Sequence, residues 1–288
     1  MANNSEKPLV SCITPSFRME RYLKTFLDRL PEQTIFDRIQ VVLDHNEPTE
    51  QELSWVKEFE EKYPGVIKHV VVDPVEPIGI SMNRCINLAD GDFVAIWNVD
   101  DLRTPDSLEK QANVLLENED VDVVHGNFVI VNSFPHFKGK MIDHSQYKFN
   151  QKEYTRSMVL GPFFMWRKSL CDKAGKFDEQ LKSGADFDLA IRLAIHGKVD
   201  IAHGVLGYYL DEGRGASTRG DSIQPIERTL IEMRYGILDK LVHSWMPEVN
   251  KRKYIVEKLV FDNKAHRIED YVPDYSNFRH RNTKLAKS

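Results

Sequence analysis

Residues 1–130 alternate between short apolar segments and amphipathic segments, and this alternation constrains the fold more than any other feature of the chain. The apolar segments have the length of strands, and the segments between them repeat apolar residues at helical spacing. The strand-like segments are residues 9–14, 39–43, 66–72, 93–97 and 121–131. Strands that alternate with helices over short connections predict a mostly parallel sheet with helices on both of its faces. We therefore expect an α/β domain.

The part of the chain from residue 133 to residue 222 is less regular. Residues 133–157 are polar, aromatic and irregular, which is typical of a loop over a site or of a short hairpin. Residues 187–196 are apolar nearly all round, and such a helix is expected to be buried. The remaining strand-like segments are residues 161–167, 199–202 and 205–210. Aromatic residues in the first of these strands could form an apolar platform for a ligand, but core packing is the interpretation that we favour.

Residues 223–288 follow as a C-terminal extension, in which we expect helices over residues 226–245 and 254–260. An apolar stripe in the first helix predicts packing on the preceding domain or a homodimer contact; it consists of Ile226, Leu230, Met233 and Ile237. The last residues form a basic tail that could touch an anionic membrane surface, where each cation contributes about 1 kcal/mol. Solvation of this tail is the simpler interpretation. We divide the chain into a domain of residues 1–222 and a helical extension of residues 223–288.

Composition excludes several classes of protein. The 288-residue chain has a formal net charge of −5, which is too small to indicate nucleic acid as a partner. Its three cysteines, Cys12, Cys85 and Cys171, fit no metal-ligand spacing, and such a sparse, odd set is typical of a reducing compartment. The chain shows no apolar signal core and no apolar segment of the roughly 20 residues that cross a bilayer. We expect a cytoplasmic protein, peripheral at a membrane if the basic tail contacts lipid.

Carboxylates follow three of the first four strand-like segments. Asp44 follows the second, Asp73 the third, and Asp100 and Asp101 come after the fourth. Ligands of open α/β sheets bind outside the carboxyl ends of the strands, so these acids are expected at one edge. Because Mg²⁺ and Mn²⁺ take one or two carboxylates together with phosphate oxygens, a metal–diphosphate complex would suit this edge. The alternative is that the last two acids cap the helix that follows Pro105.

Five segments, in order and with sensible spacing, resemble family 2 glycosyltransferases of the GT-A fold. VSCITPSF at 10–17 is similar to the opening strand of that family, and GISMNRCINLADGD at 79–92 to its Ala-Arg-Asn helix. NVDD at 98–101 takes the place of the Asp-x-Asp-Asp motif. GKFDE at 175–179 and SGADFDLAIRL at 183–193 are similar to the Gly-Gly-Phe-Asp-Glu turn and to the Glu-Asp-x-Asp-Leu helix.

The resemblance implies an inverting transfer of a sugar from a nucleotide sugar, usually a UDP-sugar, to a glycan or lipid-linked hydroxyl acceptor. It places Thr14 and Pro15 of the opening strand at the nucleotide. Asp44 would contact the base or the ribose, and Asp73 has a weaker claim to the same task. Arg84 would face the diphosphate, because its guanidinium fork matches phosphate oxygens.

The resemblance also implies a divalent cation and a general base. Asp100 would hold Mn²⁺ or Mg²⁺, while Asp101 would orient neighbours or cap a helix. Asp186 aligns with the family's general base, which would deprotonate the acceptor hydroxyl. The alternative is that Asp186 belongs to a Ser-x-x-Asp capping box that begins at Ser183. Arg214 lies in a polar, glycine-rich loop that is expected to close on the diphosphate, unless its charge is merely solvated.

Two positions depart from the family pattern. Asn98 replaces the first Asp of the motif, which usually contacts the ribose or the sugar, and Ala185 replaces the Glu before the candidate base. These departures leave open a non-catalytic relative that binds nucleotide sugars or glycans. A nucleotidyltransferase also carries carboxylates on such a sheet, but it usually needs a basic, glycine-rich loop after the first strand. Residues 16–20 are not such a loop.

Overall fold

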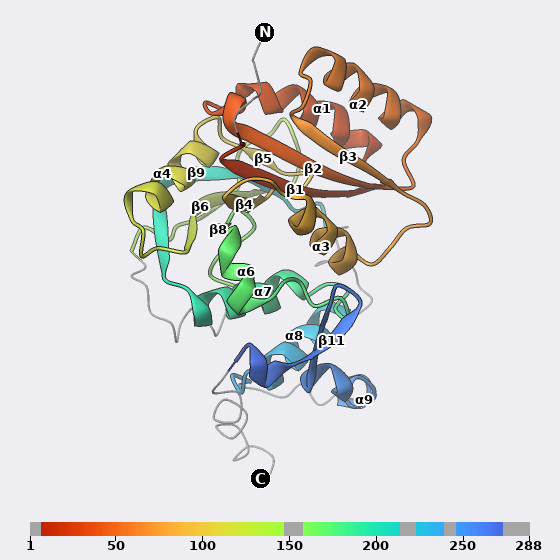
Figure 1. Cartoon of the computed structure of the whole chain (residues 1–288), viewed down its shortest axis with the longest axis vertical. Helices are drawn as coiled ribbons and strands as arrows, with labels where there is room; N and C mark the ends of the chain where they lie inside the picture. Colours follow the sequence, from red (N-terminus) through yellow and green to blue (C-terminus); the bar gives the residue numbers. More distant parts are fainter. Residues whose placement is uncertain (1–6, 147–157, 214–222, 239–245, 273–288) are drawn as a thin grey trace.

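A mostly parallel sheet forms the centre of the protein, in a computed structural model that describes residues 7–146, 158–213, 223–238 and 246–272 (Figure 1). Its first four strands lie in the order β3-β2-β1-β4 and run parallel. They are β1 (Val10–Phe17), β2 (Ile39–Asn46), β3 (Ile67–Val72) and β4 (Phe93–Ile96). The predicted parallel α/β sheet is therefore confirmed.

The second half of the sheet is mixed. Strand β8 (Met165–Arg167) runs antiparallel to both β4 and β6 (Val123–Val131), and β9 (Val199–Leu210) runs parallel to β6. Two short strands complete the sheet: β5 (Leu102–Arg103) pairs with β9, and β7 (Lys140–Ile142) pairs with β6 as the hairpin that was one of the two expectations for this region. The two strands expected at 199–202 and 205–210 are one strand with a bulge.

Helices cover both faces of the sheet, as the alternation predicts (Figure 1). One face packs against α1 (Glu20–Arg29), α2 (Glu50–Lys62) and α4 (Ser107–Glu117). The opposite face packs against α3 (Ile78–Leu88) and α7 (Ala185–His196). Helix α2 begins at a capping box, in which the Thr49 hydroxyl accepts from the Glu52 N–H and the Glu52 carboxylate accepts from the Thr49 N–H.

The helix α7 runs from the carboxyl edge of the sheet back to the amino edge. His196 ends the helix, and Val199 starts β9 beside Val123, at the end where β4 and β6 also begin. The opposite end of α7 must therefore point toward the carboxyl ends of the parallel strands. Asp186, in the first turn of this helix, lies on that side.

The C-terminal extension packs on the sheet's α3/α7 face rather than standing apart. Its elements are α8 (Ile223–Arg234), α9 (Met246–Lys251), a 3-10 turn (Lys253–Val256), and a hairpin of β10 (Lys258–Phe261) and β11 (Lys264–Arg267). The expected apolar stripe of α8 packs into the same core as α7, which favours the first of its two predicted roles. The expected helix over residues 254–260 is wrong, because that segment ends as a strand. The division at residue 222 stays a prediction.

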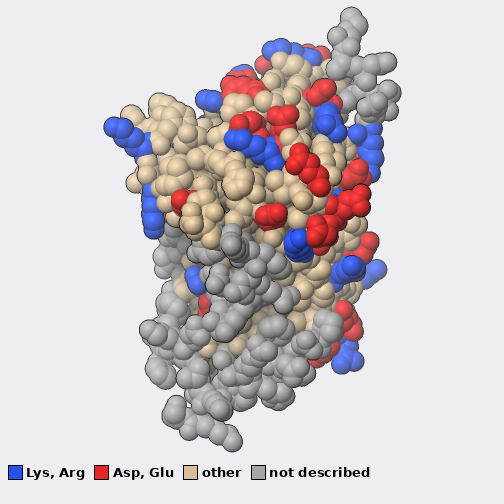
Figure 2. Space-filling view, turned by 90° about the vertical axis from the view of Figure 1, so that its left-hand side faces the viewer, with Lys and Arg blue, Asp and Glu red and all other residues tan. Residues whose placement is uncertain are grey.

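The described surface carries mixed charge. On the face shown in Figure 2, acidic and basic side chains are interspersed beside a broad uncharged area. Among the helices of the described residues, none is both long enough and apolar enough to cross a bilayer. The expectation of no nucleic acid partner stays a prediction.

Candidate active site

The carboxyl end of β1 brings two hydroxyl groups to the candidate site. Thr14 and Ser16 are buried, and within the described part of the chain their hydroxyl oxygens have no hydrogen-bond partner. Buried polar atoms are normally paired, so a pair of unsatisfied hydroxyls marks a place where a ligand can supply the partner. Pro15 lies between them, opposite Asp44 of β2. Sequence reasoning identified Thr14 and Pro15 but missed Ser16.

Asp44 anchors a polar network beneath this edge. The carboxylate is fully buried within β2 and accepts from Arg84 at 2.6 Å and from Asn46 at 2.7 Å. The same guanidinium binds Glu76 with its other nitrogen, and the Glu76 N–H donates to Asn46. Both arms of the Arg84 fork hold carboxylates, so its single positive charge offsets part of the negative charge of Asp44 and Glu76. Its contact with a diphosphate, and that of Asp44 with a base or ribose, stay predictions.

The turn after β4 places two carboxylates side by side. Asp101 is buried; it accepts from the Leu210 N–H at 3.0 Å and from the Asn98 amide at 3.1 Å, which fixes the turn against the end of β9. Burial and the neighbouring Asp100 raise the pKa of Asp101 to about 8. This arrangement gives Asn98 a reason to be Asn, because an aspartate there could not donate and would add a third acid.

Asp100 lies half-buried at the lip of this turn. Desolvation, and secondarily the Glu212 carboxylate, raise the pKa of Asp100 above its usual range. Among the described residues, no Lys or Arg forms a salt bridge with it. A partly desolvated acid without a basic partner fits a cation, since burying an unpaired charge is costly.

The described residues hold no ready-made cage of three or more protein ligands for a metal. A divalent cation at a diphosphate needs only one or two carboxylates, because phosphate oxygens and water complete its shell. The residues present therefore fit such a cation, with Asp100 as its protein ligand. His125 is buried in the core beside His144 and lies away from this turn's carboxylates in the sequence.

The segment after β9 is tied to α1 across the mouth of the site. Glu212 accepts from the Tyr22 hydroxyl at 2.7 Å and from Arg21 at 3.2 Å. These contacts hold the start of the loop that follows β9 above the Asp100 turn. No local pattern in the sequence predicts the contact of Tyr22 with Glu212, because the two residues lie 190 residues apart. Arg214 lies outside the described residues.

Asp186 occupies the first turn of α7. Its side chain is exposed to solvent, and one carboxylate oxygen accepts from the Phe187 N–H at 2.8 Å. Part of the side chain is open to solvent, but many protein atoms lie around the carboxylate and displace water from it. This desolvation raises the pKa of Asp186, and the hydrogen bond from the Phe187 N–H lowers it by less. The N-cap of α7 is Gly184, without a side-chain cap, so the capping-box alternative at Ser183 is wrong.

A buried charge network fixes the middle of α7. Asp188 accepts from Arg192 at 2.6 Å, from Arg234 at 2.6 Å and from the Tyr235 hydroxyl at 2.8 Å. Arg234 also binds Asp178 at 2.7 Å. Burial opposes ionisation, yet Arg192 and Arg234 outweigh it and hold the pKa of Asp188 below its usual range. The network joins the C-terminal extension to α7.

Two other expectations concern the edges of the site. Asp73 is exposed and follows the last residue of β3, one position beyond the level of Asn46. Its role stays a prediction.

The aromatic segment at residues 161–167 is core: Phe163, Phe164 and Trp166 are each at most 2% exposed. The favoured interpretation of that segment is therefore confirmed.

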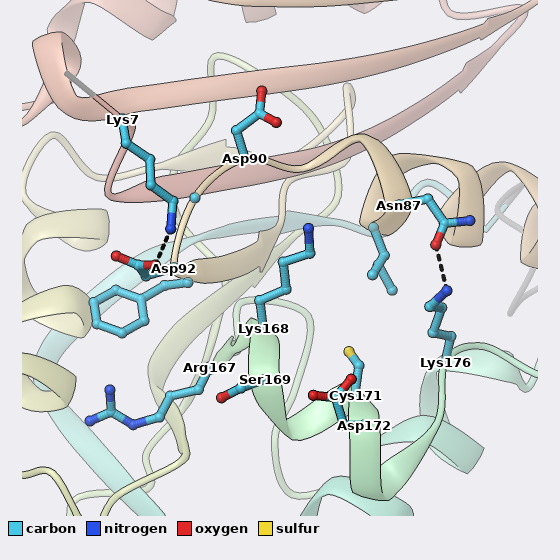
Figure 3. Close-up of a pocket in the computed structure, with 13 residues that line it drawn as sticks. Lys7, Asn87, Asp90, Asp92, Arg167, Lys168, Ser169, Cys171, Asp172 and Lys176 are labelled. Atoms are coloured by element: carbon cyan, nitrogen blue, oxygen red, sulfur yellow. Dashed lines mark hydrogen bonds and ion pairs between the residues drawn. The ribbon is translucent and has the colours of Figure 1, made fainter. Parts of the chain in front are cut away.

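A separate cavity of about 640 Å³ lies at the opposite, amino-terminal edge of the sheet (Figure 3). It is lined in part by Lys7, Lys168 and Lys176, which suggests anion binding at first sight. Each ammonium group is already engaged, however, by Asp92, by the Ala89 carbonyl oxygen, and by Asn87 with Asp262, respectively. The candidate active site is therefore placed at the carboxyl edge.

The chain matches the family model described as glycosyl transferase family 2 over residues 11–175, which is more than half of its length. The chain belongs to glycosyl transferase family 2. An uncharacterised glycosyltransferase of Methanocaldococcus jannaschii is 28% identical over 210 residues, which are 70% of each protein. The hyaluronan synthase of Pasteurella multocida is 22% identical over 193 residues, or 66% of this chain. The matched part is only 19% of the synthase, so the activity of that whole protein does not carry over.

Solved structures share the fold. Residues 1–349 of TarS from S. aureus, in complex with UDP-GlcNAc, match 86% of this chain and 72% of that chain with a TM-score of 0.66 at 19% identity. The mannosyltransferase PcManGT of Pyrobaculum calidifontis, in complex with GDP-Man and Mn²⁺, matches 100% of this chain and 78% of that chain with a TM-score of 0.58 at 17% identity. These likenesses confirm the GT-A fold, and the family assignment makes the protein a glycosyltransferase.

Proposed function

We propose that this glycosyltransferase moves a sugar from a nucleotide sugar, most simply a UDP-sugar, to a hydroxyl group of a glycan or lipid-linked acceptor, with inversion at the anomeric carbon. The observation that carries the proposal is the half-buried Asp100 carboxylate at the carboxyl end of β4, which has no basic partner among the described residues. A cation bound to a diphosphate would supply that partner. TarS with UDP-GlcNAc and PcManGT with GDP-Man and Mn²⁺ support this type of ligand.

The nucleotide would lie along the carboxyl edge, from β2 to the turn after β4. The unsatisfied Thr14 and Ser16 hydroxyls are free to bond to it. The Asn98 amide nitrogen is committed to Asp101, which leaves its carbonyl oxygen to accept from a sugar hydroxyl. The ion pair of Asp44 with Arg84 stabilises this edge of the sheet.

In the proposed reaction, Asp186 removes the proton of the acceptor hydroxyl. The hydroxyl oxygen forms a bond to the anomeric carbon from the face opposite the nucleotide, and the bond from that carbon to the diphosphate oxygen breaks. The raised pKa of Asp186 suits a base, because proton affinity near the working pH improves proton transfer. A bound Mn²⁺ or Mg²⁺, held by Asp100, would offset negative charge on the departing diphosphate.

The first test is thermal unfolding of the purified protein with UDP, GDP, ADP or CMP, each with and without Mn²⁺. A ligand that binds only the folded state at 100 times its Kd adds about 2.7 kcal/mol of stability and raises the Tm by several degrees. We expect the largest shift with UDP and Mn²⁺ together. The shift should disappear in Asp100→Ala.

A matched control is Asp172→Ala, which removes an exposed acid from the cavity at the amino edge. This variant should keep the full ligand-induced shift. A metal-dependent shift with GDP in place of UDP would change the donor class but not the reaction. Equal shifts in wild type and Asp100→Ala would refute the proposed metal site. The cytoplasmic location and the membrane and homodimer contacts also stay proposals.

A further inference from the structure

Glu227 of α8, in the C-terminal extension, contacts the loop that leads into α7. The side chain is fully buried. Its carboxylate accepts from three successive backbone N–H groups: Lys182 at 2.9 Å, Ser183 at 2.7 Å and Gly184 at 3.0 Å. Gly184 is the N-cap of α7 and Asp186 stands two residues further on. The carboxylate that binds the N-cap residue of the candidate catalytic helix and the two residues before it thus comes from α8, 43 residues away from Gly184.

The chemistry of this contact favours a fixed loop geometry. The Gly184 N–H belongs to the N-terminus of α7, where N–H groups lack helical partners and attract an anion. The Lys182 and Ser183 N–H groups belong to the preceding loop and converge on the same carboxylate. Hydrogen bonds from N–H groups to a carboxylate are shorter and stronger than neutral ones. Of the basic groups that the structure describes, Arg252 is the one paired with it, and its guanidinium nitrogen is 3.8 Å from the carboxylate. The charge of Glu227 is therefore balanced mainly by the loop itself.

Packing leaves the loop little room to move. A Cβ atom on Gly184 would lie 2.7 Å from the terminal methyl of Ile231, which is also in α8. One turn further along, Arg234 and Tyr235 bind Asp188 of α7. Helix α8 thus holds α7 at its N-terminal loop and again at its first turns.

We propose that Glu227 is a positioning residue for glycosyl transfer, which fixes the 182–184 loop and thereby the place of the Asp186 carboxylate. The inference rests on the proposed function, in which Asp186 is the base. In this proposal the C-terminal extension helps to position the catalytic base. A base must lie within hydrogen-bond reach of the proton it removes, and a misplacement of about 1 Å can cost about 10²-fold in rate.

The experiment compares Glu227→Gln and Glu227→Asp with wild type, Asp186→Asn and Leu230→Ala. The Gln variant keeps the shape and loses the charge; the Asp variant keeps the charge but is too short to reach all three N–H groups. Leu230 is fully buried in the same helix and has no hydrogen bond to the loop, so its truncation controls for loss of stability alone. For each variant we would measure kcat and the donor KM. Amide hydrogen exchange of residues 182–187 would be measured in the same full-length proteins.

We expect both Glu227 variants to lose about 10- to 100-fold in kcat, with a donor KM within about twofold of wild type, and to exchange the loop amides faster. Leu230→Ala should lower the Tm but keep kcat and loop protection. Unchanged kcat in both Glu227 variants, with Asp186→Asn inactive, would overturn the inference while the proposed function stands. Equal losses of kcat in Leu230→Ala and the Glu227 variants would also overturn it. No transfer by the wild type with any nucleotide sugar would instead refute the proposed function.

Discussion

Replacing Arg234 by Met removes the cation that joins the C-terminal extension to the catalytic domain. The guanidinium is fully buried and binds Asp188 at 2.6 Å and Asp178 at 2.7 Å. After the substitution, Asp188 keeps Arg192 and the Tyr235 hydroxyl. Asp178 keeps the Gln180 side chain and the Gln180 and Val260 N–H groups but, among the described residues, no ion pair. Arg192 still acts on it electrostatically, yet the buried Asp178 carboxylate has lost its direct cationic partner.

Breaking a buried ion pair by removing one partner typically costs 3–5 kcal/mol, because the other charge stays buried. We expect Arg234→Met to lower the free energy of unfolding by about 4 kcal/mol at pH 7. Urea denaturation, followed by the fluorescence of the buried Trp97 and Trp166, measures this loss. The double variant Arg234→Met with Asp178→Asn should recover part of the stability, because it removes the uncompensated charge.

A control variant lies on the same helix. Arg228 pairs with Glu232 at 2.9 Å, but its side chain is 56% exposed. Exposed ion pairs contribute about 0–1 kcal/mol, so Arg228→Met should change stability little. A loss of less than 1 kcal/mol in Arg234→Met, or no recovery in the double variant, would refute the reasoning about buried charge.

Three further predictions concern stability. Asn98→Asp replaces the amide that donates to Asp101 by a carboxylate and adds an acid beside Asp100 and Asp101, so chemical denaturation at pH 7 should show a loss of about 1–3 kcal/mol; an unchanged midpoint would contradict it. Burial, with a smaller effect of a neighbouring imidazole, lowers the pKa of His125 to about 3, so only the unfolded state gains this proton below about pH 6.5. Stability should fall by about 2 kcal/mol from this group between pH 7.5 and 5, and His125→Gln should show a correspondingly shallower loss in the same titration. A Cβ on Gly91 would lie 2.7 Å from the Ser11 backbone nitrogen, so Gly91→Ala should lower the unfolding free energy by about 1–3 kcal/mol, measured in urea.

The alternation of apolar and amphipathic segments was sufficient to predict the parallel half of the sheet. The alternation gave a wrong prediction in the C-terminal extension, where the pairing of two strands determines the structure. The segment 254–260 carries apolar residues that fit a helix, but Lys258–Phe261 pairs with Lys264–Arg267 across a two-residue turn. Asp262 and Asn263 adopt φ values of 53° and 56° there, as tight hairpin turns require. This Asp-Asn pair was the available signal.

The candidate site divides in the same way. Candidates that sit on motifs could be proposed from the sequence: Asp100 because it follows a buried strand, and Asp186 because the family resemblance implies it. Glu212 and Glu227 could not, because each acts on groups that are distant along the chain. The ion pair of Arg84 with Asp44 was also hidden, although both residues had been singled out for the nucleotide. Sequence motifs point to the candidate carboxylates, but the partners of these carboxylates depend on tertiary contacts that the motifs do not contain.

The central claim is tested most directly by the release of nucleoside diphosphate from a panel of nucleotide sugars, with Mn²⁺ and with glycan or lipid-linked acceptors. We predict release by the wild type that rises with acceptor, falls to background in Asp100→Ala and Asp186→Asn, and leaves nucleotide binding intact in Asp186→Asn. Acceptor-dependent release that persists at the wild-type rate in both variants would contradict the assignment of the metal ligand and the base.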